Sequence, residues 1–208
     1  MQLFKHFSEE ERFAVLRNLC AVTKHYQKGE TVLHAGSENR YIFTVLSGSV
    51  KIQNIDIWGN TSVLNMVEKG QVFAEAYAFL PGEKLLVEAV ANEPCEVLLI
   101  DTRRIFALPE SEAKNKLIQN LLFISSMKNV HLSRRILHTS SKRVRERVLS
   151  FLSEQAERQE SRYVTIPYDR QQMADYLSVE RSALSKELSK MKAEGLIDYH
   201  KNTFRIRI

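Results

Sequence analysis

The sequence predicts a mixed α+β protein with an antiparallel β-roll first, a long central helix next, and a small helical domain ending in a β-hairpin last. Three observations predict this order. Glycines recur at intervals of 7 to 12 residues between Gly29 and Gly70, an apolar helical pattern then runs from about Glu110 to Leu137, and two short helical patterns precede alternating β-type runs at the C-terminus. We expect domains at residues 1–109, 110–138 and 139–208.

The N-terminal part should begin with a short helix and continue as the roll. The segment Ser8–Leu19 is amphipathic, and Ser8 is a suitable N-cap followed by acidic residues that favour a helix N-terminus. Short β-type runs then lie between the glycines, as is typical of antiparallel barrels and rolls. These runs are Thr31–Leu33, Tyr41–Leu46, Val50–Ile52 and Ser62–Leu64, with Glu96–Ile100 as the closing strand.

The central helix carries more apolar surface than one roll can cover. Phe123, Met127, Val130 and Leu137 follow a coiled-coil-like rhythm, so we expect a second subunit to pack here and the protein to be a homodimer. The segment 138–141 interrupts the pattern and is the predicted hinge. A basic helix over residues 142–157 should follow it.

The C-terminal segment predicts a winged helix-turn-helix. A first helix over residues 171–177 is followed by a three-residue turn and a second helix over residues 181–193, which Gly195 ends. A hairpin with a basic tip at residues 200–202 forms the wing. The second helix has one apolar face and one face of hydroxyl and basic residues, the groups that reach bases and phosphates in double-stranded DNA. The predicted DNA-binding residues are Arg170, Arg181, Ser182, Ser185, Lys186, Ser189 and Lys201.

Composition agrees with this interpretation and argues against several others. Residues 139–208 hold 14 Lys and Arg against 10 Asp and Glu, a surplus of four within the chain's net charge of +5. No apolar run could span a membrane and the start lacks a secretory signal core, so we expect a cytoplasmic protein. Cys20 and Cys95 cannot form a four-cysteine cluster, and no catalytic constellation, metal-ligand spacing or phosphate-binding glycine loop occurs. We therefore expect no enzyme activity, no metal and no cofactor.

The order and size of these parts resemble the Crp/Fnr family of bacterial transcription regulators over nearly the whole chain. The resemblance lies in YQKGETVLHAGSENRYIFTVLSGSVKI (26–52), EKGQVFAEAYAF (68–79) and RQQMADYLSVERSALSKEL (170–188). It implies a homodimer that binds two-fold symmetric DNA and an effector in the roll that modulates DNA affinity. RNA polymerase is a further candidate partner. Ser182 and Lys186 stand where many members carry Glu and Arg, so the operator should differ from the family's commonest half-sites.

The departures from the family bear on the effector. Members that bind cyclic nucleotides carry Gly-Glu where this chain has Ala74-Glu75, and an Arg-Ser/Thr pair where it has Leu85-Leu86. A buried cyclic phosphate would lack its cation, so we expect cyclic AMP to be rejected and an uncharged or weakly polar effector to bind, unless the protein needs none. The predicted pocket residues are Phe73, Glu75, Leu85, Leu86, Phe123 and Met127.

Two alternatives stay open at this point. The first is an allosteric module that binds a cyclic nucleotide with Lys84 as the phosphate partner. The second is a haem or redox sensor of the same fold, for which the available axial ligands are His34, His131, His138, Cys20 and Cys95.

Overall fold

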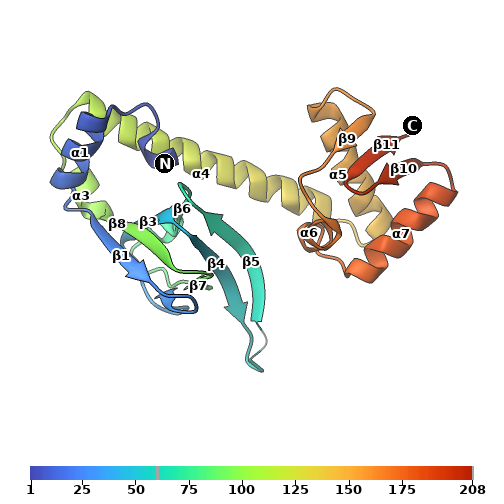
Figure 1. Ribbon diagram of the computed structural model, residues 1–208, viewed down its shortest axis with the longest axis horizontal. Helices are drawn as coiled ribbons and strands as arrows, with labels where there is room; N and C mark the ends of the chain where they lie inside the picture. The colour runs from blue at the N-terminus through green and yellow to red at the C-terminus, as the bar shows by residue number, and fades with distance from the viewer. Residues whose placement is uncertain (60, 208) are drawn as a thin grey trace. The chain divides into compact units, whose positions relative to one another are not determined.

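The chain divides into two compact units, and the division falls within one long helix. In the computed structural model, which describes residues 1–59 and 61–207, the units are Met1–Met127 and Lys128–Ile208 (Figure 1). The domain limits expected at 109 and 138 stay a prediction. No helix in the described part of the chain is both long and apolar enough to cross a membrane.

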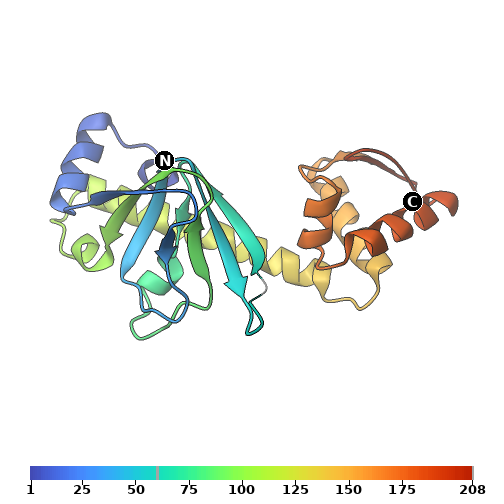
Figure 2. The same ribbon diagram turned by 60° about the horizontal axis from the view of Figure 1, so that its bottom comes forward.

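The first unit contains the predicted antiparallel roll, built from two four-stranded sheets (Figure 2). The first sheet has the order β1-β8-β3-β6 and the second the order β2-β7-β4-β5. Apolar side chains of both sheets, among them Phe43, Val97, Val50 and Ala89, form a shared core. The strands are β1 (Val22–Tyr26), β2 (Thr31–Leu33), β3 (Tyr41–Ser47), β4 (Ser49–Ile55), β5 (Thr61–Glu68), β6 (Val72–Phe73), β7 (Glu88–Ala91) and β8 (Cys95–Asp101).

One glycine of the predicted pattern is required for two independent reasons. Gly48 joins β3 to β4 with a φ of +71°, a conformation that side chains disfavour. A Cβ at this position would also lie only 2.4 Å from the carbonyl oxygen of Pro94. The tight junction between these strands therefore depends on the absence of a side chain.

Helices cover the first sheet on the side away from the roll interior. The capping box of Ser8 and Glu11 begins the predicted N-terminal helix, and Lys116 binds Glu11 with an Nζ–Oε1 distance of 2.8 Å. Leu117, Leu121 and other apolar residues of the long helix pack in the same core as Ile100 of β8. The helical elements of this unit are η1 (Gln2–Phe4), α1 (Glu9–Asn18), α2 (Glu75–Ala78), α3 (Thr102–Phe106) and the first half of α4 (Glu112–Thr139).

The second unit is the predicted winged helix-turn-helix with one additional strand. Helix α6 begins with a capping box between Asp169 and Gln172, and the hairpin strands pair from Ile197–Ile206 to His200–Thr203. A short strand that the sequence analysis did not predict, β9, extends this hairpin to three strands. The elements are α5 (Val144–Arg158), β9 (Tyr163–Thr165), α6 (Arg170–Tyr176), α7 (Arg181–Ala193), β10 (Ile197–His200) and β11 (Thr203–Ile206).

The predicted hinge at residues 138–141 is wrong in its position. Helix α4 continues through His138 to Thr139, and the break lies at residues 140–143, so α5 begins at Val144 rather than at residue 142. His138 is only 1% exposed, and its ring nitrogens lie 2.9 Å from Ser150 Oγ and 2.6 Å from Glu154 Oε2. Packing against α5 keeps this polar residue inside the helix, although the sequence pattern suggested a break there.

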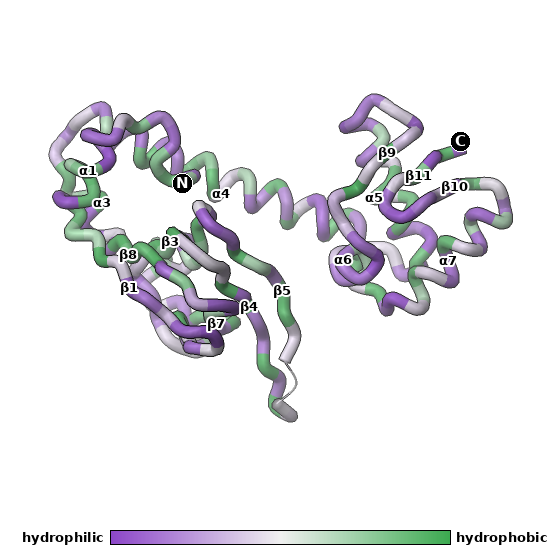
Figure 3. The backbone as a smooth tube through the Cα atoms, in the orientation of Figure 1, coloured by the Kyte–Doolittle hydropathy of each residue, from purple (hydrophilic) through white to green (hydrophobic). Residues whose placement is uncertain are grey.

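The exposed side of α4 is apolar along much of its length. Hydrophobic and hydrophilic residues alternate along the α4 tube in Figure 3. Within one chain the predicted seam is uncovered, since Phe123, Met127, Val130 and Leu137 all have between 45% and 65% of their surface exposed. A second set of exposed apolar residues accompanies the seam, namely Ile118, Leu122, Leu132 and Ile136.

Candidate nucleic-acid interface and ligand pocket

Helix α7 presents a basic, polar face because its apolar face is completely buried. Leu184, Leu188 and Met191 have no exposed surface and anchor the helix in the core of the second unit. Arg181 and Lys186 are exposed on the other side. Within the described chain, neither of these two cations has a recorded carboxylate partner, so both charges are available to an external anion.

The three predicted serines of this face are not equivalent. Ser182 donates a hydrogen bond to Glu180 Oε1, and Ser189 donates one of 3.0 Å to the carbonyl oxygen of Ser185. Ser185 is half-buried, and in the described part of the chain its hydroxyl makes no hydrogen bond. A base or phosphate would therefore have to compete for Ser182 and Ser189 with partners inside the protein.

The structure places Arg170 against the wing rather than at the surface. Its guanidinium lies 5.1 Å from the ring centre of Tyr199 and 5.7 Å from that of Phe204. Burial lowers the pKa of Arg170, because loss of water disfavours the charged guanidinium. Lys201 is exposed at the hairpin tip with a φ of +52°. Of these two predicted DNA-binding residues, Lys201 is presented to solvent and Arg170 fixes the wing to α6.

Sequence analysis missed the arginines that hold the helices of this unit together. Arg145 of α5 pairs with Glu187 and Glu194 at N–O distances of 2.7 Å, and its hydrogen bond lowers the pKa of Glu194. Arg147 donates to the carbonyl oxygens of Leu177 and Ser178, in the turn before α7. The sequence KRVRER (142–147) was interpreted only as a source of positive charge, but two of its arginines point inward to these partners.

Arg135 near the end of α4 makes a similar contact with α6. Its Nε and Nη2 donate to the carbonyl oxygens of Tyr176 and Asp175 at 3.2 and 2.9 Å. Arg134 beside it pairs with Glu154 of α5 at 2.9 Å. The last turns of α4 therefore belong to the helix-turn-helix unit.

The predicted ligand-pocket residues divide into a buried and an exposed group. Phe73, Glu75 and Leu85 are each only 4% exposed, and Phe73 contacts Phe43 at 5.1 Å between ring centres. Leu86 is 74% exposed, and Lys84 is exposed as well. Leu85 therefore faces inward, while its two neighbours face solvent. The prediction that Leu86 lines the interior is not met within this chain.

The remaining predicted pocket residues lie on α4 and are exposed in the single chain. Phe123 is 59% and Met127 52% exposed, so they do not join the buried group of Phe73, Glu75 and Leu85. Of the candidate haem ligands, His138 is already bound through both ring nitrogens. Among the described residues, no cluster of three His, Cys, Asp or Glu could hold a metal ion.

The backbone at Ala74 is strained. This residue precedes α2 with a φ of +60°, in the left-handed region that glycine adopts without cost. Its carbonyl oxygen accepts a hydrogen bond from Asn39 Nδ2 at 3.2 Å, which helps to hold the conformation. The resemblance described above places a glycine here in members that bind cyclic nucleotides, so this chain keeps the turn without its preferred residue.

Comparisons with known proteins agree with this architecture. The model of the cyclic nucleotide-binding domain family matches residues 23–112, and that of the Crp-like helix-turn-helix domain family matches residues 146–208. The chain belongs to the Crp/Fnr family of transcription regulators. The family domains thus coincide with the roll and with the unit that presents α7.

Characterised Crp/Fnr relatives are distant in sequence. The cAMP-activated global transcriptional regulator CRP of Haemophilus influenzae is 22% identical over 86% of this chain and 80% of its own length. The nitrogen fixation regulation protein FixK of Rhizobium meliloti is 25% identical over 83% and 76%.

Solved Crp/Fnr structures share the fold. CprK complexed with OCPA has a TM-score of 0.70 at 19% identity, covering 92% of this chain and 90% of that one. The c-di-GMP responsive global regulator CLP of Xanthomonas campestris has a TM-score of 0.57 at 19% identity, covering 94% and 99%.

Replacement of Ala74 by glycine should stabilise the first unit. The left-handed conformation costs an alanine about 1–2 kcal/mol, and the greater freedom of glycine in the unfolded chain offsets roughly half of this. We expect Ala74→Gly to raise the free energy of unfolding by about 0.5–1 kcal/mol in urea titrations. Gly29→Ala, at a φ of +87° with no neighbour near its Cβ, is the matched control and should destabilise. A destabilised Ala74→Gly variant would contradict the assignment of strain.

Proposed function

We propose that this chain is a homodimeric, sequence-specific DNA-binding regulator whose DNA affinity responds to an effector in the β-roll. The observation that carries the proposal is the face of α7, where Arg181 and Lys186 are exposed and pair with no carboxylate among the described residues. Other cations of the same unit, such as Arg145, are already paired. Action on DNA implies a cytoplasmic location, and recruitment of RNA polymerase is an additional proposed role.

Each predicted DNA-binding residue takes a proposed role from its placement. Lys186 and Ser185 lie where α7 would contact base edges in the major groove, and Arg181 lies at the helix N-terminus, beside a phosphate or base. Lys201 at the wing tip would contact a phosphate. Ser182 and Ser189 contribute only after exchanging their internal bonds, and Arg170 positions the wing.

Removal of Lys186 and of Lys201 should have different consequences. Lys186→Ala should cost about 1–3 kcal/mol on the protein's own promoter and relax the preference for that sequence. Lys201→Ala should weaken binding to all sequences alike and reduce the slope of log K against log salt by about one. Fluorescence anisotropy over a salt series measures both effects.

The control for these variants is Lys28→Ala, which removes one positive charge from the first unit. It should leave promoter affinity and its salt slope unchanged. Unaltered promoter affinity in both Lys186→Ala and Lys201→Ala would show that α7 does not read DNA.

The proposed dimer rests on the exposed seam of α4. An isolated chain would leave Phe123, Met127, Val130 and Leu137 in contact with water, a patch of the kind that marks protein interfaces. Two-fold pairing would bury this seam and present two copies of α7 to a palindromic operator with half-sites about one helical turn apart.

A charge placed in the seam should separate the subunits. We expect sedimentation to show a dimer for the parent protein and a monomer for Met127→Glu at micromolar concentration, because the carboxylate would be buried without a partner. Asn129→Glu adds the same charge at an exposed position outside the seam and should remain dimeric. A monomeric parent protein would rule out the proposed dimer.

The effector is proposed to occupy the interior near Phe73, Glu75 and Leu85. Relatives on this fold are named for cAMP activation and for a c-di-GMP response, which supports an effector in this part of the chain. Here the only charged member of the buried group is the carboxyl residue Glu75. An uncharged donor group would suit Glu75, and Phe73 and Leu85 would contact an apolar body.

Cyclic AMP and cyclic GMP should fail to bind. The inward residue at the phosphate position is Leu85, and Lys84 faces solvent, so a buried phosphate would have no charge-assisted partner. Isothermal titration calorimetry should show no binding at micromolar concentrations. Micromolar binding that Lys84→Ala abolishes would overturn this expectation and make Lys84 the phosphate partner.

A further inference from the structure

An open depression lies beside β1 and α3, and two of its lining residues, Tyr41 and Leu99, pack in the same core as Phe73. Its volume is about 770 Å³, and its walls come from β1, the start of β3, the end of β8 and α3. None of the residues proposed for DNA or effector binding lines it. The lining residues are Cys20, Val22, Lys24, Arg40, Tyr41, Leu99, Asp101, Arg103, Arg104 and Ala107.

The rim of this depression is strongly cationic. It carries Lys24, Arg40, Arg103 and Arg104 against the single carboxylate of Asp101. Lys24 and Arg104 are exposed, and within the described chain neither has a recorded carboxylate partner. Arg104 instead donates a hydrogen bond of 3.1 Å to the sulfur of Cys20. The local surplus of positive charge is therefore not neutralised inside the protein.

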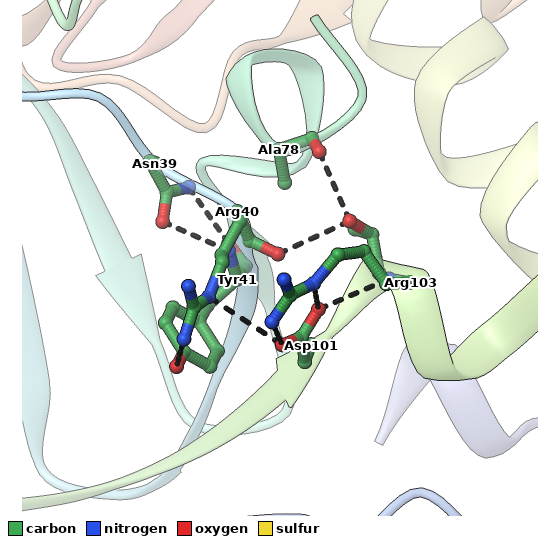
Figure 4. Close-up of polar contacts among 7 residues, drawn as sticks. Asn39, Arg40, Tyr41, Ala78, Asp101 and Arg103 are labelled. Atoms are coloured by element: carbon green, nitrogen blue, oxygen red, sulfur yellow. Dashed lines mark hydrogen bonds and ion pairs between the residues drawn. The ribbon is translucent and has the colours of Figure 1, made fainter. Parts of the chain in front are cut away.

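Asp101 holds two of the arginines in fixed positions. Arg103 binds both of its carboxylate oxygens, at 3.0 and 2.6 Å, and Arg40 Nε lies 3.4 Å from Oδ2 (Figure 4). Arg40 also stacks on Tyr41 at 5.0 Å and donates to its hydroxyl. The hydrogen bond from Arg103 lowers the pKa of Asp101, so the carboxylate stays ionised and the two guanidinium groups stay ordered at neutral pH.

The floor between these cations is apolar. Val22, Leu99 and Ala107 line it together with the ring of Tyr41, and Val22 remains 53% exposed. Exposed apolar surface beside the exposed cations Lys24 and Arg104 suits a molecule that has an apolar body and an anionic group. We propose that this depression binds a small organic oxyanion, a carboxylate or phosphate ester whose apolar part lies on Val22 and Tyr41 and whose anionic group lies between Lys24 and Arg104.

The site is connected to the helix that carries Glu75. Asn39 donates to the carbonyl oxygens of Tyr41 and Ala74, at 2.7 and 3.2 Å. Thr102 Oγ1 lies 3.1 Å from the carbonyl oxygens of both Arg40 and Ala78. A ligand that restrains Arg40 and Tyr41 therefore acts on the segment bonded to both ends of α2. Through these hydrogen bonds, binding of the oxyanion would affect the position of α2 and of Glu75 in the roll interior.

Alkylation of Cys20 tests the proposal in the full-length protein. Cys20 is exposed in the depression, whereas Cys95 is buried and serves as an internal reference. The rate of Cys20 modification by neutral iodoacetamide, followed by mass spectrometry, should fall when phenyl phosphate is added. A dissociation constant of about 1 mM would slow the reaction about tenfold at about 10 mM ligand, by simple mass action.

Three other compounds, at the same concentration and ionic strength, define the ligand class. Benzyl alcohol lacks the anion, inorganic phosphate lacks the apolar body, and an oligoglutamate peptide represents an acidic partner protein. The first two should protect Cys20 much less than phenyl phosphate does. Equal protection by inorganic phosphate would rule out a role for the apolar floor, and protection by oligoglutamate alone would identify a protein-docking surface instead.

Substitutions of Lys24 and Arg104 test whether the anionic group binds between these two side chains. Lys24→Ala/Arg104→Ala should lose the protection, expressed as the ratio of rates with and without phenyl phosphate in the same variant. Lys28→Ala removes one charge elsewhere in the first unit and should keep it. Lys24→Ala alone, at a solvent-exposed side chain, should lose part of the protection and covers the case in which the double variant unfolds. Unchanged protection in Lys24→Ala and the double variant would overturn the proposal. No DNA enters the assay, so its result is independent of the proposed regulatory function.

Discussion

The helix-turn-helix unit depends on how the carbonyl groups at the end of α6 are satisfied. The last carbonyls of any helix lack partners within it, and cations are favoured there by the helix dipole. Here Arg135 of α4 binds those of Asp175 and Tyr176, while Arg147 of α5 binds those of Leu177 and Ser178. These four carbonyls lie immediately before α7. Two guanidinium groups that belong to other helices therefore fix the turn before α7, while the buried face of α7 and Arg145 hold the helix itself.

This arrangement determines where a conformational change can be transmitted. The break at residues 140–143 is not a free joint, because Arg147 also donates to the carbonyl oxygen of Ser141 at 2.6 Å. His138 lies buried on α5, and Arg134 pairs with Glu154 of the same helix. The final turns of α4 must therefore move together with α6 and α7. A change in the proposed dimer seam on α4 would reach the proposed DNA-contacting face through these bonds rather than through a flexible linker.

The parts that the sequence predicted well are those whose pattern depends on local geometry. The limits of α7 followed from Leu184, Leu188 and Met191 at helical spacing and from Gly195 after the helix, and the wing followed from simple alternation. The end of α4 was misplaced because His138 was judged polar, whereas its burial depends on Ser150 and Glu154 from α5. The strand β9 was missed because its three residues acquire a β conformation by pairing with β11. Leu86 was assigned to the pocket by analogy with a pair of residues, but it lies in a bend before β7, where only Leu85 of the pair is buried.

The two proposed ligand sites of the roll differ in how much water an anion would lose on binding and in whether a cation would contact it. In the interior, a phosphate would lose its water beside Leu85, and the nearest cation in sequence, Lys84, faces solvent. The free energy lost by burying an unpaired charge is far larger than the free energy gained from an apolar contact. At the depression, Lys24 and Arg104 are exposed, so an oxyanion could meet both while keeping part of its hydration. The roll interior thus has no cation beside Leu85, whereas the depression has a surplus of positive charge. Asn39 and Thr102 connect the two sites through their hydrogen bonds to Ala74 and Ala78, at the two ends of α2.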